Sequence, residues 1–274
     1  MAQSTSTYSA SDGPAYERFI GRWTARVAER IARDCIDPPS APLPEGPLLD
    51  VGCGTGSLAC ALATHHPDRQ ITGVDVAEPY LAFARDRAEA QRIDFRHGDA
   101  CALPLPDDGF AAACALIVLN FVSDPDTAIR EMARVVQPGG RILLSGWDFR
   151  GGLVYQRLLW DTAAMLDETA AELRDRIFAN PLALPEGMPD LLARGGLADI
   201  VRDSVTIRMD FADFDDYWSP LLGGQGPVGG YVAGLPENRR ADVARAVRRA
   251  FLSGAPDGPR SLTATAWVVT GRVP

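Results

Sequence analysis

The chain has 274 residues, of which 46% are hydrophobic and 23% charged, a composition that is typical of globular domains and excludes disordered, collagen-like and coiled-coil chains. Asp and Glu outnumber Lys and Arg by 36 to 27, so the net charge is -9 and a nucleic-acid backbone would be repelled. The longest apolar run, residues 110–119, is about half of the roughly 20 residues that span a membrane. We therefore expect neither a nucleic-acid nor a membrane partner.

The N-terminal residues and the cysteines indicate the compartment. Residues 1–13 are polar and rich in Ser and Thr, without the basic start and apolar stretch of a signal peptide. The five cysteines form no Cys-x-x-Cys pair, and no histidine stands at zinc spacing from them. Reduced thiols and a cytoplasmic location are the expectation.

In chain order, the first predicted element is a helix over residues 14–34, because apolar side chains recur there at spacings of three and four. Five prolines between residues 38 and 47 then end regular structure. After them short apolar strands alternate with helices, which predicts a parallel sheet covered on both faces. The strands are expected at 48–51, 71–74, 94–96, 110–119 and 141–145, and the helices at 58–65, 79–91 and 124–136.

The pattern changes after residue 149. Two long β-type runs follow, at 200–211 and 262–273, and the segment 222–230 between them predicts a flexible Gly-rich loop. Mobile loops commonly complete active sites, so we expect this loop, with Gln225, to bend over a bound substrate. Helices are expected at 153–178, 188–194 and 236–252.

The segment Leu-Leu-Asp-Val-Gly-Cys-Gly-Thr-Gly at residues 48–56 runs from a buried strand directly into a helix. Glycines there let the backbone turn sharply and lie against a ligand, beside the free N–H groups of a helix N-terminus. A purely structural turn is the alternative, since Gly occurs in many loops. The spacing is Gly-x-Gly-x-Gly, which differs from the Gly-x-Gly-x-x-Gly of dinucleotide sites, and Asp50 would repel a pyrophosphate but suit a cationic amine.

Two further acidic residues follow strand ends. Asp75 ends the strand after the glycines, where a carboxylate can accept hydrogen bonds from both hydroxyls of a ribose, with a helix N-cap as the alternative. Asp99 could accept from an adenine amine while the Ala100 N–H donates to a ring nitrogen, with an ordinary turn as the alternative. Because the carboxyl ends of parallel strands meet at one edge, we expect these residues to form one ligand site.

These motifs resemble those of the class I S-adenosylmethionine (SAM)-dependent methyltransferases, and within them the small-molecule branch called methyltransferase type 11 or UbiE-like. The similar stretches are residues 48–56, Gly-Val-Asp-Val at 73–76, Gly-Asp-Ala at 98–100 and Arg-Val-Val-Gln-Pro-Gly-Gly-Arg at 134–141. The resemblance implies an α/β, Rossmann-like class I fold, with a mostly parallel seven-stranded sheet, helices on both faces and a helical cover.

The same resemblance divides the chain into three parts. Residues 1–46 would form an N-terminal helix and a Pro-rich linker, and residues 47–150 the SAM-binding core. Residues 151–274 would complete the sheet and cover the substrate.

The resemblance also implies contacts to each part of SAM and of its product S-adenosylhomocysteine (SAH). In the N-terminal helix, Tyr16 and Arg22 are implied as lid contacts, with core packing as the alternative for Tyr16. The remaining contacts are Asp50, Gly52, Cys53, Gly54 and Gly56 for the methionine part, Asp75 for the ribose, Val76, Asp99 and Ala100 for the adenine, and Asn120 and Phe121 for the sulfonium.

Methyl transfer from a sulfonium is an in-line displacement, so the protein mainly aligns the acceptor and excludes water. We predict Asn120, Asp148 and Tyr231 as catalytic residues, and a small-molecule acceptor that is apolar or aromatic in part, because aromatic residues gather after residue 149. The chain lacks the Asn-Pro-Pro-Tyr of nucleic-acid and protein amino methyltransferases. It also lacks the acidic pairs of metal-assisted catechol methyltransferases, so no metal is expected.

Two alternatives to methyl transfer stay open. One is a SAM- or SAH-binding protein of the same fold without turnover. The other is a nicotinamide-dependent oxidoreductase, which the glycine spacing and Asp50 disfavour. The histidines His65, His66 and His97 are not expected to be catalytic, and the sequence assigns no oligomeric state.

Overall fold

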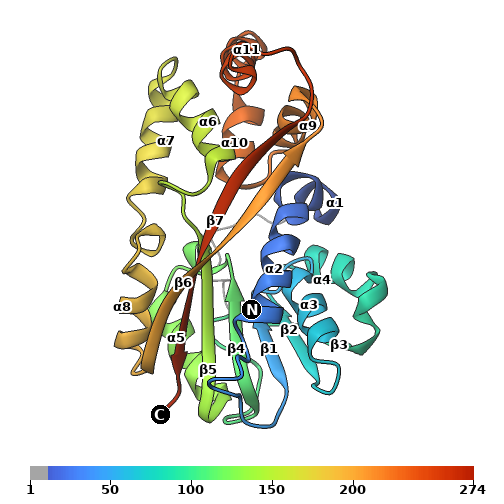
Figure 1. Cartoon of the computed structure of the whole chain (residues 1–274), viewed down its shortest axis with the longest axis vertical. Coiled ribbons are helices and arrows are strands. Elements are labelled where there is room, and N and C mark those ends of the chain that lie inside the picture. Colours follow the sequence, from blue (N-terminus) through green and yellow to red (C-terminus); the bar gives the residue numbers. More distant parts are fainter. Residues whose placement is uncertain (1–11) are drawn as a thin grey trace.

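The computed structural model describes residues 12–274, and its strands form one sheet in the order β3-β2-β1-β4-β5-β7-β6 (Figure 1). Neighbouring strands are parallel except at β7, which runs antiparallel to β5 and β6. The predicted Rossmann-like sheet, seven-stranded and mostly parallel, is confirmed. Residues 1–11, on which the expectation of no signal peptide mainly rests, lie outside the described part of the chain. The strands are β1 Leu48–Val51, β2 Ile71–Asp75, β3 Ile93–His97, β4 Phe110–Leu116, β5 Val136–Trp147, β6 Ala198–Phe211 and β7 Arg260–Arg272.

Helices surround this sheet, and among residues 12–274 each one is too short or too polar to span a bilayer. Short turns join them: η1 Glu17–Gly21, η2 Ala88–Arg92, η3 Leu119–Phe121, η4 Pro181–Ala183 and η5 Ser219–Gly223. The α-helices are α1 Gly13–Tyr16, α2 Arg22–Asp34, α3 Ser57–His65, α4 Glu78–Arg85, α5 Pro125–Val135, α6 Val154–Ala164, α7 Glu168–Phe178, α8 Gly187–Arg194, α9 Phe214–Trp218, α10 Gly226–Gly234 and α11 Glu237–Leu252.

The two faces of the sheet are buried in two apolar cores, because successive side chains of a strand point to opposite faces. In β1, Leu48 lies in the core covered by α2, α3 and α4, which contribute residues such as Leu58. Its neighbour Leu49 lies in the opposite core, with Ile129 of α5 and residues of α8.

The N-terminal helix predicted over residues 14–34 is interrupted, because the π-helical turn η1 separates α1 from α2. Glu17 in this turn accepts a hydrogen bond from the Thr55 hydroxyl at 2.6 Å. A Cβ on Gly21 would stand 2.6 Å from the Glu17 carboxyl, so glycine leaves the room that this side chain needs. π-helical turns often occur at functional sites, and this one contacts the glycine turn.

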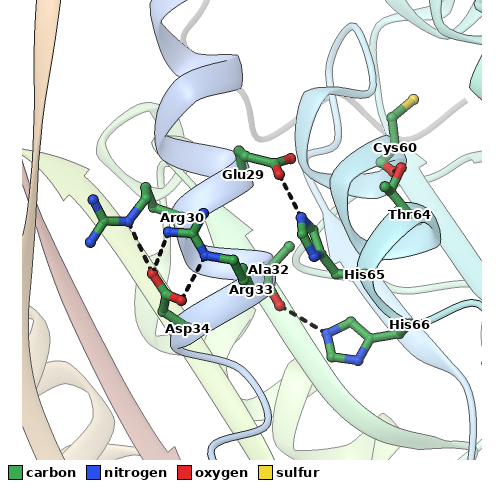
Figure 2. A network of polar contacts seen from close by, with 9 residues as sticks. All are labelled: Glu29, Arg30, Ala32, Arg33, Asp34, Cys60, Thr64, His65 and His66. Atoms are coloured by element: carbon green, nitrogen blue, oxygen red, sulfur yellow. Dashed lines mark hydrogen bonds and ion pairs between the residues drawn. The ribbon is translucent and has the colours of Figure 1, made fainter.

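Polar contacts hold α2 against the end of α3 (Figure 2). His65 Nε2 lies 2.5 Å from Glu29 Oε1, and His66 Nε2 lies 2.9 Å from the Ala32 carbonyl oxygen. Both histidines therefore serve helix packing on the outside of the core.

The second half of the chain forms a cover at one end of the molecule. There β6 and β7 extend beyond the other strands, and α6, α7, α9, α10 and α11 gather around them (Figure 1). The predicted helix 153–178 is two helices, and Asp167 caps the second by accepting from the Thr169 N–H at 3.1 Å. The predicted loop 222–230 is wrong from residue 226 on, because α10 begins there. The four glycines of α10 have low helix propensity, so the sequence does not predict this helix. The burial of Val228 and Val232 stabilises it.

Candidate functional site

The turn after β1 has three glycines at positive φ: Gly52 at +68°, Gly54 at +52° and Gly56 at +85°. A Cβ on Gly52 would stand 2.3 Å from Val118 Cγ2, too close for any other residue. The N–H groups of Gly52 and Cys53 donate to the Val74 carbonyl at 2.7 and 3.0 Å. These N–H groups are thus used inside the protein, and the glycines contribute a backbone that a ligand can approach closely.

Asp50 lies beneath this turn and is 1% exposed. Its Oδ2 accepts from the Ala59 N–H at 2.9 Å, in the first turn of α3, while its Oδ1 has no hydrogen-bond partner among residues 12–274. Burial raises the pKa of Asp50 to about 7. Asp50 and Cys53 line a small cavity of about 30 Å³ with Thr55 and Ser57. A buried carboxylate with an unpaired oxygen suits a cationic group.

Asp75, at the end of β2, holds the turn together as well as lining the larger cavity. Its Oδ2 accepts from the Gly54 N–H and its Oδ1 from the Ala77 N–H, both at 2.8 Å. The N-cap of α4 is Ala77, so the N-cap alternative for Asp75 is wrong. Burial raises the pKa of Asp75, and the hydrogen bonds to Ala77 and Gly54 lower it in part.

The large cavity has a volume of about 620 Å³ and lies at the carboxyl edge of the sheet. It brings together most of the residues that the sequence implies for the cofactor, since these follow the ends of β1, β2, β3 and β4. The predicted residues that line it are Tyr16, Gly52, Gly54, Asp75, Val76, Asp99, Ala100, Asn120 and Phe121.

Four of the predicted cofactor residues do not line this cavity: Asp50 and Cys53 line the small cavity described above, and Gly56 and Arg22 line neither. Gly56 shapes the start of α3 as its N-cap. Arg22 pairs with Asp216 of α9 at 2.8 Å, and its guanidinium lies 4.4 Å from the centre of the Trp23 ring. Arg22 therefore ties the N-terminal helix to the cover. Its lid role stays a prediction.

The predicted catalytic residues Asp148 and Tyr231 also have partners elsewhere. Asp148 Oδ1 accepts from the Gly151 N–H at 2.9 Å and so stabilises the turn after β5. The Tyr231 hydroxyl donates to Asp167 Oδ2 at 2.8 Å, and its ring packs on Trp160. Their catalytic roles stay predictions, whereas Asn120 does line the cavity.

Sequence reasoning missed several lining residues, among which Ile117 carries a backbone signal. Ile117 follows β4 with φ at +58°, a conformation that β-branched residues rarely adopt and that often marks functional sites. Its N–H donates to the Ser145 carbonyl at 2.7 Å, which fixes the turn. No sequence pattern gives a φ angle of this kind. The other missed lining residues include Phe19, Ile20, Val118, Val122, Gln156, Arg176, Ile177 and Asn180.

A buried hydrogen bond also joins the cover to the cofactor side. The Tyr80 hydroxyl donates to Gln225 Oε1 at 3.1 Å, and the Tyr80 ring lies 5.2 Å from that of Tyr16. Gly224, Gly226, Pro227 and Gly230 of the same segment line the cavity. Among the residues that the structure describes, no three His, Cys, Asp or Glu side chains come together as a metal site would require.

Comparison with known proteins relates this chain to methyltransferases. Residues 49–144 match the family described as "Methyltransferase domain". The O-methyltransferase rstn1 of Aspergillus nomiae is 37% identical over 172 residues, which are 60% of this chain and 71% of that protein. The demethylmenaquinone methyltransferase of Thermus thermophilus is 39% identical over 99 residues, 35% of this chain. The chain spans 45% of the Thermus protein's length, and a similar share of other curated relatives.

Among solved structures, the [4+2]-cyclase SpnF is similar over 100% of this chain and 88% of its own, with a TM-score of 0.54 and 26% sequence identity. The strand order, the glycine turn with its two carboxylates and the match to most of rstn1 lead to one conclusion. This chain belongs to the class I SAM-dependent methyltransferase family.

Proposed function

We propose that the protein transfers the methyl group of SAM to a small-molecule acceptor bound in the 620 Å³ cavity. One observation carries the proposal: the cavity has cofactor-motif residues on one wall and residues of α6, α7 and α10 on the other. A cofactor and a second molecule would thus share one enclosure, which is what an in-line displacement requires.

The residues present fit SAM at each part of the cofactor. The unpaired Oδ1 of Asp50 would accept from the ammonium group, and Asp75 has lone pairs left for the ribose hydroxyls. Asp99 and Ala100 would bind the adenine edge. When bound, SAM supplies a methyl group activated by its sulfonium.

On the acceptor side, the protein's task would be to position the nucleophile and exclude water. Trp147 and Phe149 line the cavity and supply apolar surface. Asn120 Oδ1 is buried without a hydrogen-bond partner among the described residues, so a hydroxyl or amine of the acceptor would satisfy it. Asn120 is therefore the catalytic candidate that the geometry supports best.

Two of the relatives, by their names, methylate demethylmenaquinone and an oxygen atom. Together with the apolar wall, these names support an acceptor that is apolar or aromatic in part. A cytoplasmic location and independence from metal ions remain parts of this proposal.

A second candidate is a SAM- or SAH-binding protein that catalyses a reaction without methyl transfer. The similarity to SpnF, named a [4+2]-cyclase, along the whole chain favours this candidate. In such a protein the cavity would bind one apolar substrate and hold it in a folded conformation next to a bound cofactor.

Calorimetry with SAH and NAD tests the cofactor, and SAH binding without NAD binding is the expected result. A panel of phenols, quinols and hydroxylated polyketides is then incubated with SAM, with and without EDTA, and SAH release is measured. Release in both conditions supports the proposed methyl transfer. Conversion of a polyketide without SAH release would instead support the second candidate, and loss of turnover with EDTA would overturn the metal-free expectation.

A further inference from the structure

The two walls of the large cavity differ in charge. The acidic residues that line it, Asp75 and Asp99, both stand on the cofactor side. On the wall formed by the cover, the charged residue that lines it is Arg176, near the end of α7. In a chain of net charge -9, this wall thus presents a cation to an entering acceptor.

The Arg176 guanidinium has no hydrogen bond or ion pair with any group that the structure describes. Arg174, two residues earlier on the same helix, instead pairs with Asp175 at 2.9 Å and with Asp161 at 3.7 Å. Arg176 is solvent-exposed and also lines the cavity, so it lies where the cavity opens. An unpaired guanidinium at such an opening offers five N–H donors to a ligand.

The residues of the cover that line the cavity with Arg176 supply donors and apolar surface. Asn180 Oδ1 accepts from the Leu182 N–H at 2.9 Å, so its amide NH₂ is what remains for a ligand. Gln156 of α6 lines the same wall and can also donate. Ile177 and Phe149 add apolar surface next to these groups. A flat apolar body with an anionic oxygen group at one end complements this arrangement.

We propose that the acceptor carries an anionic oxygen group, such as a carboxylate or an ionised enol or phenol, which Arg176 binds at the cavity opening. Arg176 is then a specificity residue for the acceptor and contributes nothing to cofactor binding. The inference rests on the proposed function, because it assumes that this wall faces the acceptor.

The test uses two fluorescent probes of almost the same shape, 1-anilinonaphthalene-8-sulfonate and its uncharged parent N-phenyl-1-naphthylamine. Both are titrated into the full chain with and without saturating SAH. We expect Arg176→Ala to weaken binding of the sulfonate about tenfold, the effect of one charge-assisted hydrogen bond, and to leave the uncharged probe within about twofold. Arg176→Lys should keep part of the difference, and Arg174→Ala should behave as the wild type.

Each outcome of these titrations supports or overturns the anion site at Arg176. Equal loss of both probes in Arg176→Ala, unchanged binding of the sulfonate, or no binding of the sulfonate to the wild type would overturn the inference. SAH affinity, measured on the same variants, must stay unchanged. If the wild type fails to bind SAH, the proposed function fails, while the two titrations without SAH still test the anion site.

Discussion

The cofactor wall and the acceptor wall of the cavity are built by different means. The cofactor wall consists of strand ends whose turns are fixed by hydrogen bonds to carboxylates, as at the half-buried Asp75 with Gly54 and Ala77. The acceptor wall consists of helices of the cover, whose side chains such as Gln156 and Arg176 reach the cavity individually. The bond between Tyr80 and Gln225 is one of the contacts that link it to the cofactor side.

This difference explains how one fold can serve several acceptors. A substitution in the cofactor wall disturbs backbone geometry, because glycines and carboxylates there support each other. A substitution at Gln156 or Arg176 changes one side chain at the cavity and leaves the sheet intact. We therefore expect large effects on SAH binding from the first wall and selective effects on the acceptor from the second.

The largest expected effect tests Asp75. Asp75→Ala removes the proposed acceptor of the ribose hydroxyls and also the acceptor of the Gly54 N–H. We expect a loss of about 2 to 4 kcal/mol in SAH binding, or roughly 30- to 1,000-fold. Calorimetry measures it. Asp75→Asn, which keeps one carbonyl oxygen, should lose less, and unchanged affinity in Asp75→Ala would refute the ribose assignment.

The second prediction compares glycines from the two halves of the chain. Gly52 and Gly196 both have positive φ, at +68° and +80°, but a Cβ meets Val118 at 2.3 Å in the first case and nothing within 4 Å in the second. We expect Gly196→Ala to lower the free energy of unfolding by about 1 kcal/mol, the cost of the backbone conformation alone. Gly52→Ala should lower it by about 3 kcal/mol, since overpacking adds to that cost.

Val118 lines the cavity, so Gly52→Ala should also weaken SAH binding about 100-fold, whereas Gly196→Ala should leave it unchanged. Urea unfolding and calorimetry measure the two effects. Equal loss of stability in both variants would show that the contact between the new Cβ and Val118 does not lower the free energy of unfolding. The cofactor wall would then be less rigid than we infer.

The two walls also differ in how far the sequence predicts them. The cofactor wall was predictable because its residues follow strands within short motifs, and Asp50, Asp75 and Asp99 stand where the parallel topology brings strand ends together. The helix α10 was not predictable, because Gly229 and Gly230 are typical of loops. Tertiary packing overrides their low helix propensity.

Side-chain direction explains the remaining differences. Asp148 and Tyr231 stand in elements near the cavity, but each turns to a closer partner, the Gly151 N–H and Asp167 respectively. Arg176 carries no motif and lies on an ordinary amphipathic helix, so its sequence context resembles that of Arg174. Which arginine lacks an acidic partner depends on contacts between α6 and α7, which the sequence does not state.

A smaller effect is expected from the protonation of Asp50. Burial raises its pKa from the ordinary value of 3.8 to about 7, so the folded protein binds one proton more than the unfolded chain between these values, and stability falls as pH rises through that window. The ammonium of SAH would favour the ionised carboxylate. SAH affinity should therefore rise about tenfold from pH 6 to pH 8, with proton release on binding.

Calorimetry in buffers of different ionisation enthalpy measures this proton release. Asp50→Asn removes the titrating group, and we expect it to bind SAH more weakly with a flat pH profile. A flat profile in the wild type would place the ammonium group away from Asp50.

The smallest effect is expected on the acceptor wall, at Tyr231. Tyr231→Phe removes only the hydroxyl that donates to Asp167 Oδ2 at 2.8 Å, and the ring can stay packed 5.5 Å from that of Trp160. Because the lost bond joins α10 to the start of α7 and does not line the cavity, we expect about 1 kcal/mol less stability, unchanged SAH affinity and turnover within about twofold. Urea unfolding, calorimetry and SAH release measure the three quantities, with Tyr217→Phe, whose hydroxyl donates to the Tyr155 carbonyl at 2.9 Å, as the matched control. A loss of turnover of about tenfold in Tyr231→Phe alone would instead mean that this hydroxyl leaves Asp167 to reach the acceptor, as the sequence predicts.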